Sequence, residues 1–453
     1  MQDARSLIVI KNQLTPIKRG PIECTLGCAL LTGVDTAKTL IAGRIGTAPM
    51  TSESFEREAT LHRLPSQVFV LGIISLLTAM SSAMVYGLLP LFLVQVLGAT
   101  IVAVGFIEGA AEGLMSFARI GSGLASDLIG RRKPLVLLGY GVSALNKVMF
   151  PLAGAISVVL AARVIDRVGK GLRDAPRDAY MTDVTPAKIR GSGFGLRLSF
   201  YTVGYVIGPA AAMGLMAASG NNFRLVFWVA VIPAVAAMLI LFFGIRETAS
   251  KQFPRRPLRL ERTDVSLFTA SFWWAIAVAG LLSLARFSPA FLVLKAQSVG
   301  IEVAFVPIVL IVMHLVYAIA AYPFGMLADQ MNRRRQLAIG GAILLVADII
   351  LGSAGSPGLV LVGAGFWGLQ LAVTQGLLAA SVADAAPEQL RGTAFGIYDM
   401  TVGAAAFVAS FAAGGLWTVI GPASAFGFSC LVAVAAILLV LFRPRSGPAK
   451  SLA

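Results

Sequence analysis

Two copies of one short charged sequence, each set between long apolar runs, constrain the fold of this chain most strongly. Residues 123–132 read GLASDLIGRR, and residues 325–334 read GMLADQMNRR. In both copies an aspartate follows the glycine by four positions, and a pair of arginines begins four positions later. A basic loop of this kind cannot lie in hydrocarbon, so each copy marks a turn on the charged side of a bilayer. The sequence therefore predicts a duplicated membrane protein.

The composition excludes an ordinary soluble protein. Hydrophobic residues make up 57% of the 453 positions and charged residues 13%, with a mean hydropathy of +0.83, whereas soluble domains average about 25% charged residues. Because each membrane-spanning helix needs roughly 20 apolar residues, the apolar part of the chain has room for about twelve. Twelve is also a duplicated six, and we predict an all-α polytopic membrane protein.

The net charge of +15 is explained by topology, without nucleic acid as a partner. Basic residues concentrate in alternate loops, at 131–133, 246–262 and 333–335, whereas the loop at 93–99 is uncharged. Basic loops stay in the cytoplasm, so we expect both termini there. The run GAGFWG at 363–368 has the spacing of a dinucleotide loop but lies in an apolar span. We expect no cofactor and no bound metal.

The duplication extends beyond the two loops and predicts the domains. DVTPAKIRGSGFG at 183 aligns with DAAPEQLRGTAFG at 384, an offset of 201 (384 − 183). Parallel six-helix repeats place a substrate cavity between the halves near mid-membrane. For the N-terminal tail, a disordered segment and an over-extended start with initiation near Met50 both stay open. The expected parts are a cytoplasmic tail at 1–65, a six-helix bundle at 66–245, a cytoplasmic loop at 246–265, a second bundle at 266–443 and a cytoplasmic tail at 444–453.

The predicted fourth helix carries the sharpest functional signal. Its charges recur at spacings of three and four, which places them on one face; they are Arg163, Asp166, Lys170, Arg173 and Arg177, with Arg167 beside them. Each such charge costs roughly 2.5 to 3.5 kcal/mol near a helix centre, and the second half lacks the stripe. We predict a role in substrate binding or proton coupling, the alternative being a salt-bridge cluster at the cytoplasmic end.

Further charges lie within other predicted spans. Glu108 and Glu112 share one face of the second span. Three roles stay open for each of them: a proton carrier, a cation ligand, or the ion-pair partner of Lys147 or Arg197. In the second half we expect Asp399 to line the cavity and His314 to be a satisfied core residue. The candidates for substrate binding and proton coupling are Glu108, Glu112, Lys147, Arg163, Asp166, Arg167, Lys170, Arg197, Arg286 and Asp399.

The duplicated loop resembles the signature of the major facilitator superfamily between its helices 2 and 3 and again between 8 and 9. Leu128 and Gln330 replace the usual arginine after the aspartate, and Asn332 stands where the first copy has Gly130. The resemblance spans about Gln67 to Phe442. It implies a fold of twelve transmembrane helices in two pseudo-symmetric six-helix bundles that transports by alternating access.

Two further motifs resemble the same superfamily. Arg163 and Asp166 fit its fourth-helix motif, with Asp166 in place of glutamine and Arg167 in place of glycine, and the fifth helix fits the antiporter motif without its closing glycine pair. The antiporter motif goes with export. The residues that we expect to control conformational change are Gly123, Asp127, Arg131, Arg132, Gly325, Asp329, Arg333, Arg334, Gly195, Gly204, Gly208 and Pro209.

Together these features predict a monomeric secondary transporter in a bacterial inner membrane and exclude an enzyme. The expected partners are a small-molecule or ion substrate, protons and the lipid bilayer, and the expected activity is proton-coupled efflux. The run RVIDRVGKGLRDAPRDA is also similar to a bacterial branch with metal or metal-chelate carriers, so transport of iron, another metal or a chelate is one alternative. A transporter-like sensor or scaffold is the other.

Overall fold

The computed structural model describes residues 64–129, 132–186, 189–245, 268–386 and 390–442. The expected tails at 1–65 and 444–453 and the expected loop at 246–265 lie outside these residues, apart from residues 64 and 65. The bounds predicted for the domains therefore stay predictions.

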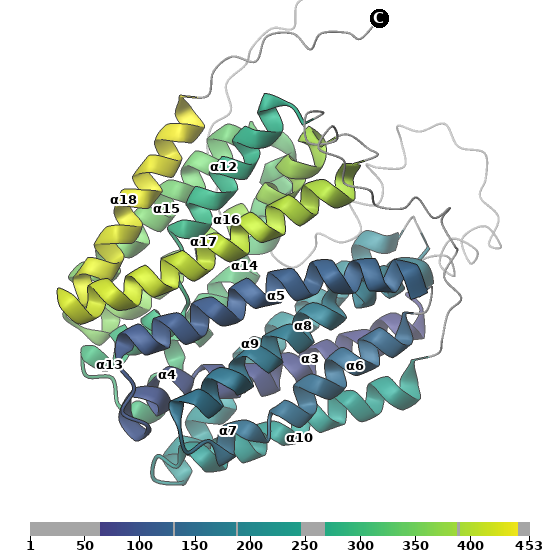
Figure 1. Ribbon diagram of the computed structural model, residues 1–453. Coiled ribbons are helices and arrows are strands. Elements are labelled where there is room, and N and C mark those ends of the chain that lie inside the picture. Colours follow the sequence, from purple (N-terminus) through teal and green to yellow (C-terminus); the bar gives the residue numbers. More distant parts are fainter. Residues whose placement is uncertain (1–63, 130–131, 187–188, 246–267, 387–389, 443–453) are drawn as a thin grey trace, which may run out of the picture. The chain divides into compact units, whose positions relative to one another are not determined.

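The described chain is helical throughout (Figure 1). The helices of the first half are α3 (Ser66–Tyr86), α4 (Leu89–Leu91), a π-helical turn (Phe92–Val96), α5 (Ile101–Ile129), α6 (Lys133–Asn146), α7 (Met149–Leu152), α8 (Ile156–Val184), α9 (Arg190–Ala218) and α10 (Phe223–Gly244). Those of the second half are α12 (Ala270–Leu284), α13 (Ala290–Ser298), a 3₁₀ turn (Val303–Phe305), α14 (Ile308–Gln330), α15 (Arg333–Ser353), α16 (Pro357–Ala385), α17 (Arg391–Val419) and α18 (Pro422–Leu441).

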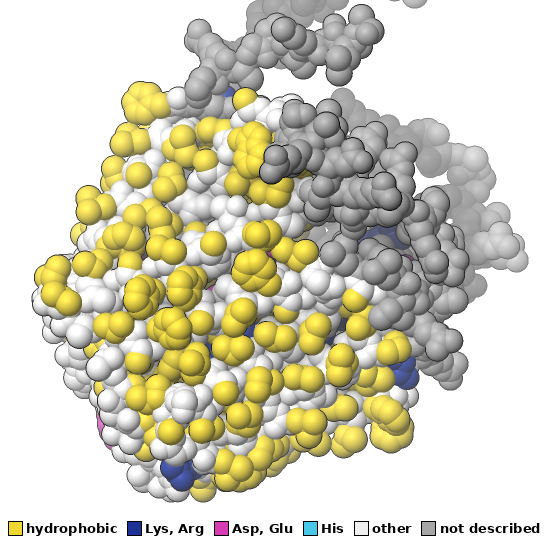
Figure 2. Space-filling model, viewed as in Figure 1, with side chains coloured by type: hydrophobic (Ala, Val, Ile, Leu, Met, Phe, Trp, Pro, Cys, Tyr) yellow, Lys and Arg dark blue, Asp and Glu magenta, His cyan; other side chains and the backbone are white. Residues whose placement is uncertain are grey.

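Ten helical stretches within the described residues are long and apolar enough to cross a membrane. The charged helix α8 is not among them, and α12 is apolar but only 15 residues long. The all-α membrane fold is therefore confirmed, while the count of twelve spans stays a prediction. Figure 2 shows the expected surface for such a fold, with hydrophobic side chains spread over the visible helices and few charges among them. Exposed side chains such as Ile232, Phe243 and Leu431 fit contact with lipid.

The chain reverses differently at the two ends of the helices. At one end four turns contain a glycine with positive φ, a conformation that disfavours other residues: Gly98, Gly220, Gly300 and Gly421. We call this the glycine end. At the other end, which we call the arginine end, the helices begin or end next to Arg132, Arg190, Arg333 and Arg334. Among the described residues, the glycines with positive φ therefore lie in the turns of the glycine end.

The helices of each half pack mainly on one another. In the first half α3 packs on α9 and α10, while α8 packs on α5 and α6; in the second half α16 packs on α14 and α15, and α15 also packs on α18. The most extensive contacts between the halves are those of α5 with α17 and of α9 with α14. At the glycine end one apolar cluster contains side chains of both halves, including Phe92, Phe227, Phe287, Phe291 and Trp417.

Helices α5 and α17 lie side by side (Figure 1) and touch most closely near the glycine end. A Cβ atom on Gly105 would lie 2.3 Å from the carbonyl oxygen of Ser410, and one on Gly414 would lie 2.9 Å from that of Ile101. Further along, a Cβ on Gly113 would be 3.7 Å from the carbonyl oxygen of Gly403. A Cβ on Gly403 would lie 2.5 Å from the side-chain oxygen of Ser116, so α5 and α17 also pack there, but their backbones approach most closely near the glycine end.

Candidate functional site

A cavity of about 420 Å³ lies between the two halves, and we call it the central cavity. Both halves supply polar side chains to its wall: Tyr86, Glu108, Glu112, Arg163, Arg167, Lys170, Tyr201 and Tyr205 from the first, and Ser283, Arg286, Ser288, His314, Tyr317 and Ser410 from the second. Phe287 and Met313 belong both to this wall and to the apolar cluster at the glycine end. The cavity is thus bounded by packed apolar side chains on that side.

The deepest polar contact of the cavity is a paired arginine and glutamate. Arg163 on α8 donates from Nε and Nη2 to the two carboxylate oxygens of Glu108 on α5, at 2.9 and 2.6 Å. Their exposed fractions are 2% and 4%. Ser288, from the second half, donates to the same carboxylate at 2.9 Å. The charge of Glu108 therefore holds together side chains of both halves.

A second buried pair lies next to this one. Lys147, the residue that follows α6, is 3.1 Å from a carboxylate oxygen of Asp166, and the hydroxyl of Tyr86 donates to the other oxygen. The ring of Tyr86 lies 4.8 Å from the Lys147 ammonium and 3.7 Å from the guanidinium carbon of Arg163. Such contacts between cations and rings are favourable. Because Tyr86 lines the cavity, it connects Asp166 to the cavity wall.

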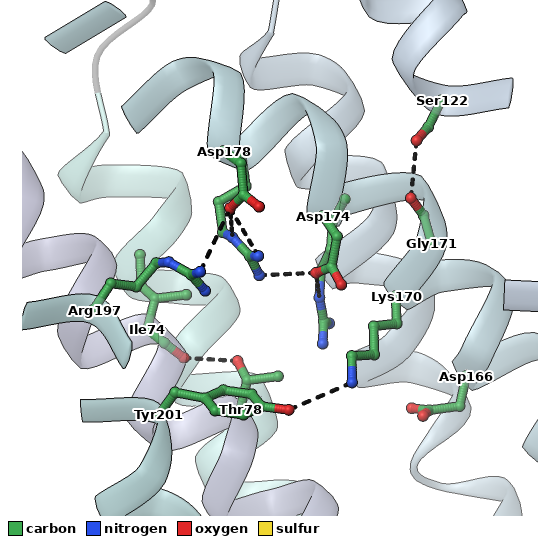
Figure 3. Close-up of polar contacts among 12 residues, drawn as sticks. Ile74, Thr78, Ser122, Asp166, Lys170, Gly171, Asp174, Asp178, Arg197 and Tyr201 are labelled. Atoms are coloured by element: carbon green, nitrogen blue, oxygen red, sulfur yellow. Dashed lines mark hydrogen bonds and ion pairs between the residues drawn. The ribbon is translucent and has the colours of Figure 1, made fainter. Parts of the chain in front are cut away.

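Arg167 and Lys170 continue the charged face of α8 along the cavity. Arg167 pairs with Glu112 at 2.7 Å, so the two glutamates of α5 pair with the arginines of α8 and not with Lys147 or Arg197. Lys170 points toward the hydroxyl of Tyr201, 3.5 Å away (Figure 3). Within the described part of the chain, Lys170 has no carboxylate oxygen within 4.0 Å.

The remainder of the stripe forms a separate network toward the arginine end. Arg177 contacts Asp174 at 2.8 Å and Asp178 at 2.9 Å, and Arg197 on α9 approaches Asp178 at 3.8 Å (Figure 3). Arg173 lies over the ring of Tyr140, 4.3 Å from its centroid. None of these side chains is among those that line the central cavity. The stripe is thus divided between a cavity part and a salt-bridge cluster, the two alternatives that its sequence left open.

Three candidates of the second half have different surroundings. Arg286 lines the cavity, and no ion pair is recorded for it among the described residues. We expected Asp399 to line the cavity, but it is not among the lining residues. It lies 3.9 Å from Arg119 of the first half. His314 was expected in the core, but it lines the cavity and stacks on Tyr205 with ring centroids 4.6 Å apart.

Comparison with known proteins decides the family. The sequence pattern of the Major Facilitator Superfamily matches residues 71–295 and 276–453. The chain belongs to this superfamily. It is 29% identical to an uncharacterised MFS-type transporter of Methanocaldococcus jannaschii, over 84% of this chain and 95% of the relative. It is also 28% identical to the class H tetracycline resistance protein of Pasteurella multocida, over 62% of this chain and 71% of the relative.

Solved structures agree on the fold. A POT family transporter in complex with 5-aminolevulinic acid superposes with a TM-score of 0.70, covering 83% of this chain and 95% of the other at 13% identity. At that identity the likeness shows the fold alone. The protein is therefore a transporter of the major facilitator fold, as its loop signature predicted.

The superfamily's loop signature is only partly described. The side chains of Asp127, Arg131 and Asp329 lie outside the described residues. Arg132 donates to Asp183 at 2.6 Å, and Arg333 pairs with Asp384. The two aspartates are 201 residues apart (384 − 183), so the halves repeat this contact between the signature loop and the end of the fourth helix of each half.

The signature glycines contribute little to helix packing. A Cβ on Gly123 would lie 3.7 Å from Ala175, an ordinary contact, and one on Gly325 would meet no atom of the described residues within 4 Å. Among the described residues, Gly325 therefore does not mark a close approach of two helices. Arg334 is the second residue of α15, and its backbone N–H donates to the side-chain oxygen of Asn332.

Two glycines of the antiporter motif in α9 are packing positions, and the first is not. A Cβ on Gly204 or Gly208 would lie 2.4 or 2.5 Å from the carbonyl oxygens of Leu76 and Met80 on α3. Pro209 follows inside the helix and is buried. A Cβ on Gly195 would meet nothing within 4 Å.

This difference gives a matched pair of single-methyl substitutions. We expect Gly208→Ala to lower the free energy of unfolding by about 1–3 kcal/mol, because the added methyl forces α3 and α9 apart. Gly195→Ala should leave it unchanged or raise it by up to about 1 kcal/mol, since alanine favours helix. Thermal unfolding of the two purified variants in detergent measures both effects, and equal midpoints would contradict the packing role.

Proposed function

We propose that the protein exports a small anionic solute from the cytoplasm in exchange for protons. The observation that carries the proposal is the charge of the central cavity. Its wall contains four basic side chains, Arg163, Arg167, Lys170 and Arg286, against two carboxylates, Glu108 and Glu112. The surplus positive charge favours an anion over a cation.

The buried arginines also have unused hydrogen-bond donors. Nη1 of Arg163 and Nε of Arg167 have no hydrogen-bond partner among the described residues. Unpaired buried donors are costly, and both arginines belong to the cavity wall. These two atoms have almost no accessible surface in this conformation, so an anion would reach them only after side chains of the wall shift, and it would then compete with Glu108 for Arg163. Because Glu108 also holds Ser288, this competition would loosen the contact between the halves and couple binding to alternating access.

Protons would act through Asp166. A proton on this carboxyl removes the charge that holds Lys147, 3.1 Å away, and leaves a buried ammonium without a counter-ion. Such an ammonium is unfavourable in the membrane interior, so the surrounding helices would rearrange. Tyr86 gives Asp166 a hydroxyl contact with the cavity, through which protons would arrive.

The direction and orientation rest on four further observations. Basic loops mark the cytoplasmic side, so the arginine end would face the cytoplasm, with both termini there. In that orientation the apolar cluster would close the cavity on the outer side, which would make this conformation inward-facing. The antiporter motif packs α9 on α3, and the Pasteurella multocida relative is named for tetracycline resistance. These features favour export. The proposed transporter acts as a monomer in a bacterial inner membrane.

The two alternatives remain as outcomes of the test. Among the described residues no group of three His, Cys, Asp or Glu side chains is placed to hold a metal ion, and both cavity glutamates are paired with arginine. A metal would therefore be carried as an anionic chelate. A sensor or scaffold without flux would show binding but no transport of any anion.

The purified protein in proteoliposomes tests the proposal. With an imposed pH gradient, wild type should move at least one member of a panel of organic anions and anionic chelates. Lys170→Gln should raise KM for that anion roughly ten-fold, since a hydrogen bond to a charged group contributes about 1.5–3 kcal/mol. Arg335→Gln, which also removes a basic charge but at an exposed position at the arginine end, should leave KM unchanged. Equal KM values for both variants, or movement of cations only, would overturn it.

A further inference from the structure

A buried carboxyl outside the central cavity has no cationic partner. Asp348 on α15 is 0% exposed. Its two oxygens contact neutral groups only: the indole Nε1 of Trp367 donates to one at 3.0 Å, and the hydroxyl of Ser429 on α18 lies 2.5 Å from the other. No Lys or Arg nitrogen within the described residues lies within 4.0 Å of it. A carboxylate charge at such a site within a membrane helix is expensive.

The hydrogen-bond partners at this site indicate its protonation state. The hydroxyl of Ser429 also contacts the carbonyl oxygen of Ala285, at the end of α12. A hydroxyl has only one hydrogen to donate, but the Ser429 hydroxyl contacts two oxygens, the carbonyl oxygen of Ala285 and Oδ2 of Asp348. Both contacts are satisfied when Oδ2 of Asp348 carries a proton. Oδ2 then donates a hydrogen bond to the hydroxyl oxygen of Ser429, and this hydroxyl donates to the carbonyl oxygen of Ala285. We propose that Asp348 is a second proton-binding site, occupied in this conformation.

The surroundings of Asp348 contain few other titratable groups. On the elements packed against it, these are Cys430 on α18 and Arg286, which follows α12. Neither forms a recorded hydrogen bond or ion pair with Asp348. No neighbour among the described residues therefore supplies a charge that would hold the carboxyl ionised.

In the internal duplication, the residues of this site occupy the positions equivalent to the charged pair of the first half. Asp348 corresponds to Lys147 (348 − 147 = 201), and Trp367 corresponds to Asp166 (367 − 166 = 201). The serine near Lys147, Ser82, likewise corresponds to Ser283. At one pair of equivalent positions the first half thus holds an ion pair, and the second half holds a carboxyl with an indole donor.

Loss of this proton would reach the central cavity through one short segment. An ionised Asp348 would compete with Ala285 for the single hydrogen of Ser429. Ala285 directly precedes Arg286 and lies three residues before Ser288, which binds Glu108. This segment between α12 and α13 is not helical, so its position depends on such contacts. The link from Asp348 to transport rests on the proposed function, whereas the proton site itself does not.

Infrared spectroscopy of the full-length protein in detergent tests the site without any solute. Wild type at pH 7 should show the carbonyl band of a protonated carboxyl, and Asp348→Asn should lose that band. Asp399→Asn, which changes a partly exposed carboxyl near Arg119, should keep it. Identical wild-type and Asp348→Asn spectra in this region would overturn the proposal.

A second variant keeps the test decisive if Asp348→Asn does not fold. Trp367→Phe removes the donor from the carbonyl oxygen of the protonated carboxyl and should shift its band to higher frequency. A band at an unchanged frequency in a folded Trp367→Phe variant would contradict the assignment to Asp348. Failure of the export proposal would appear only in the flux measurements, so the two failures are distinguishable.

Discussion

Replacing Glu108 with glutamine is expected to tighten anion binding and to stop turnover. The neutral amide no longer competes for Arg163, so an anion gains the full guanidinium. The amide also lacks the negative charge that binds both Arg163 of the first half and Ser288 of the second. Removing one partner of a buried ion pair costs about 3–5 kcal/mol of folding free energy. Calorimetric titration with the transported anion, flux in proteoliposomes and unfolding in detergent measure the three effects.

Glu112→Gln is the matched control. Glu112 lies one helical turn from Glu108 on α5, and its pair with Arg167 has the same chemistry, but the side chain of Glu112 is 29% exposed. Water therefore compensates part of the lost charge, and the loss of stability should be smaller. A Glu108→Gln variant that is as stable as Glu112→Gln and transports at the wild-type rate would contradict the role given to Glu108.

Removal of the charge of Asp166 should have an equally large effect on stability. Asp166→Leu leaves the buried ammonium of Lys147 without a counter-ion, at a cost of about 3–5 kcal/mol. Adding Lys147→Met should recover most of this loss, since replacing both members of a buried pair by apolar groups is often neutral. Unfolding of the two single variants and the double variant forms a double-mutant cycle. A double variant whose loss of stability equals the sum of the two single losses would show that the pair contributes no specific interaction.

Much of the fold could be predicted because local patterns encode it. The duplicated charged loops coincide with the connections after α5 and after α14: α5 ends at Ile129 and α6 begins at Lys133, while α14 ends at Gln330 and α15 begins at Arg333. Apolar runs of membrane-spanning length became helices for the same reason. In hydrocarbon the backbone must satisfy its own hydrogen bonds.

The partners of the charged residues could not be predicted in the same way. The spacing of the α8 charges placed them on one face, but Arg163 and Arg177 are 14 positions apart (177 − 163), which is about 21 Å along a helix. The two ends of such a stripe meet different neighbours. Glu108 meets Arg163 from 55 residues away and Ser288 from 180 residues away. These pairings arise from the packing of helices, which no spacing within one helix encodes.

The duplication held more information about the site than its motifs did. Asp183 and Asp384, which bind Arg132 and Arg333, begin the two aligned stretches that revealed the repeat. Comparing the halves position by position also shows that Asp348 occupies the position equivalent to Lys147. Neither relation is visible in the hydropathy of a single span. Both follow from the geometry that the two halves share.

The central claim is that the buried charges of the first half couple protons to solute movement, and one flux measurement tests it most directly. The variant with both Lys147→Met and Asp166→Leu, once shown to fold, is reconstituted beside wild type. Its exchange of the identified anion is followed with and without an imposed pH gradient. We predict that the variant still exchanges the anion at equal pH but that the gradient no longer drives net accumulation. Net accumulation at the wild-type level in the variant would contradict the account.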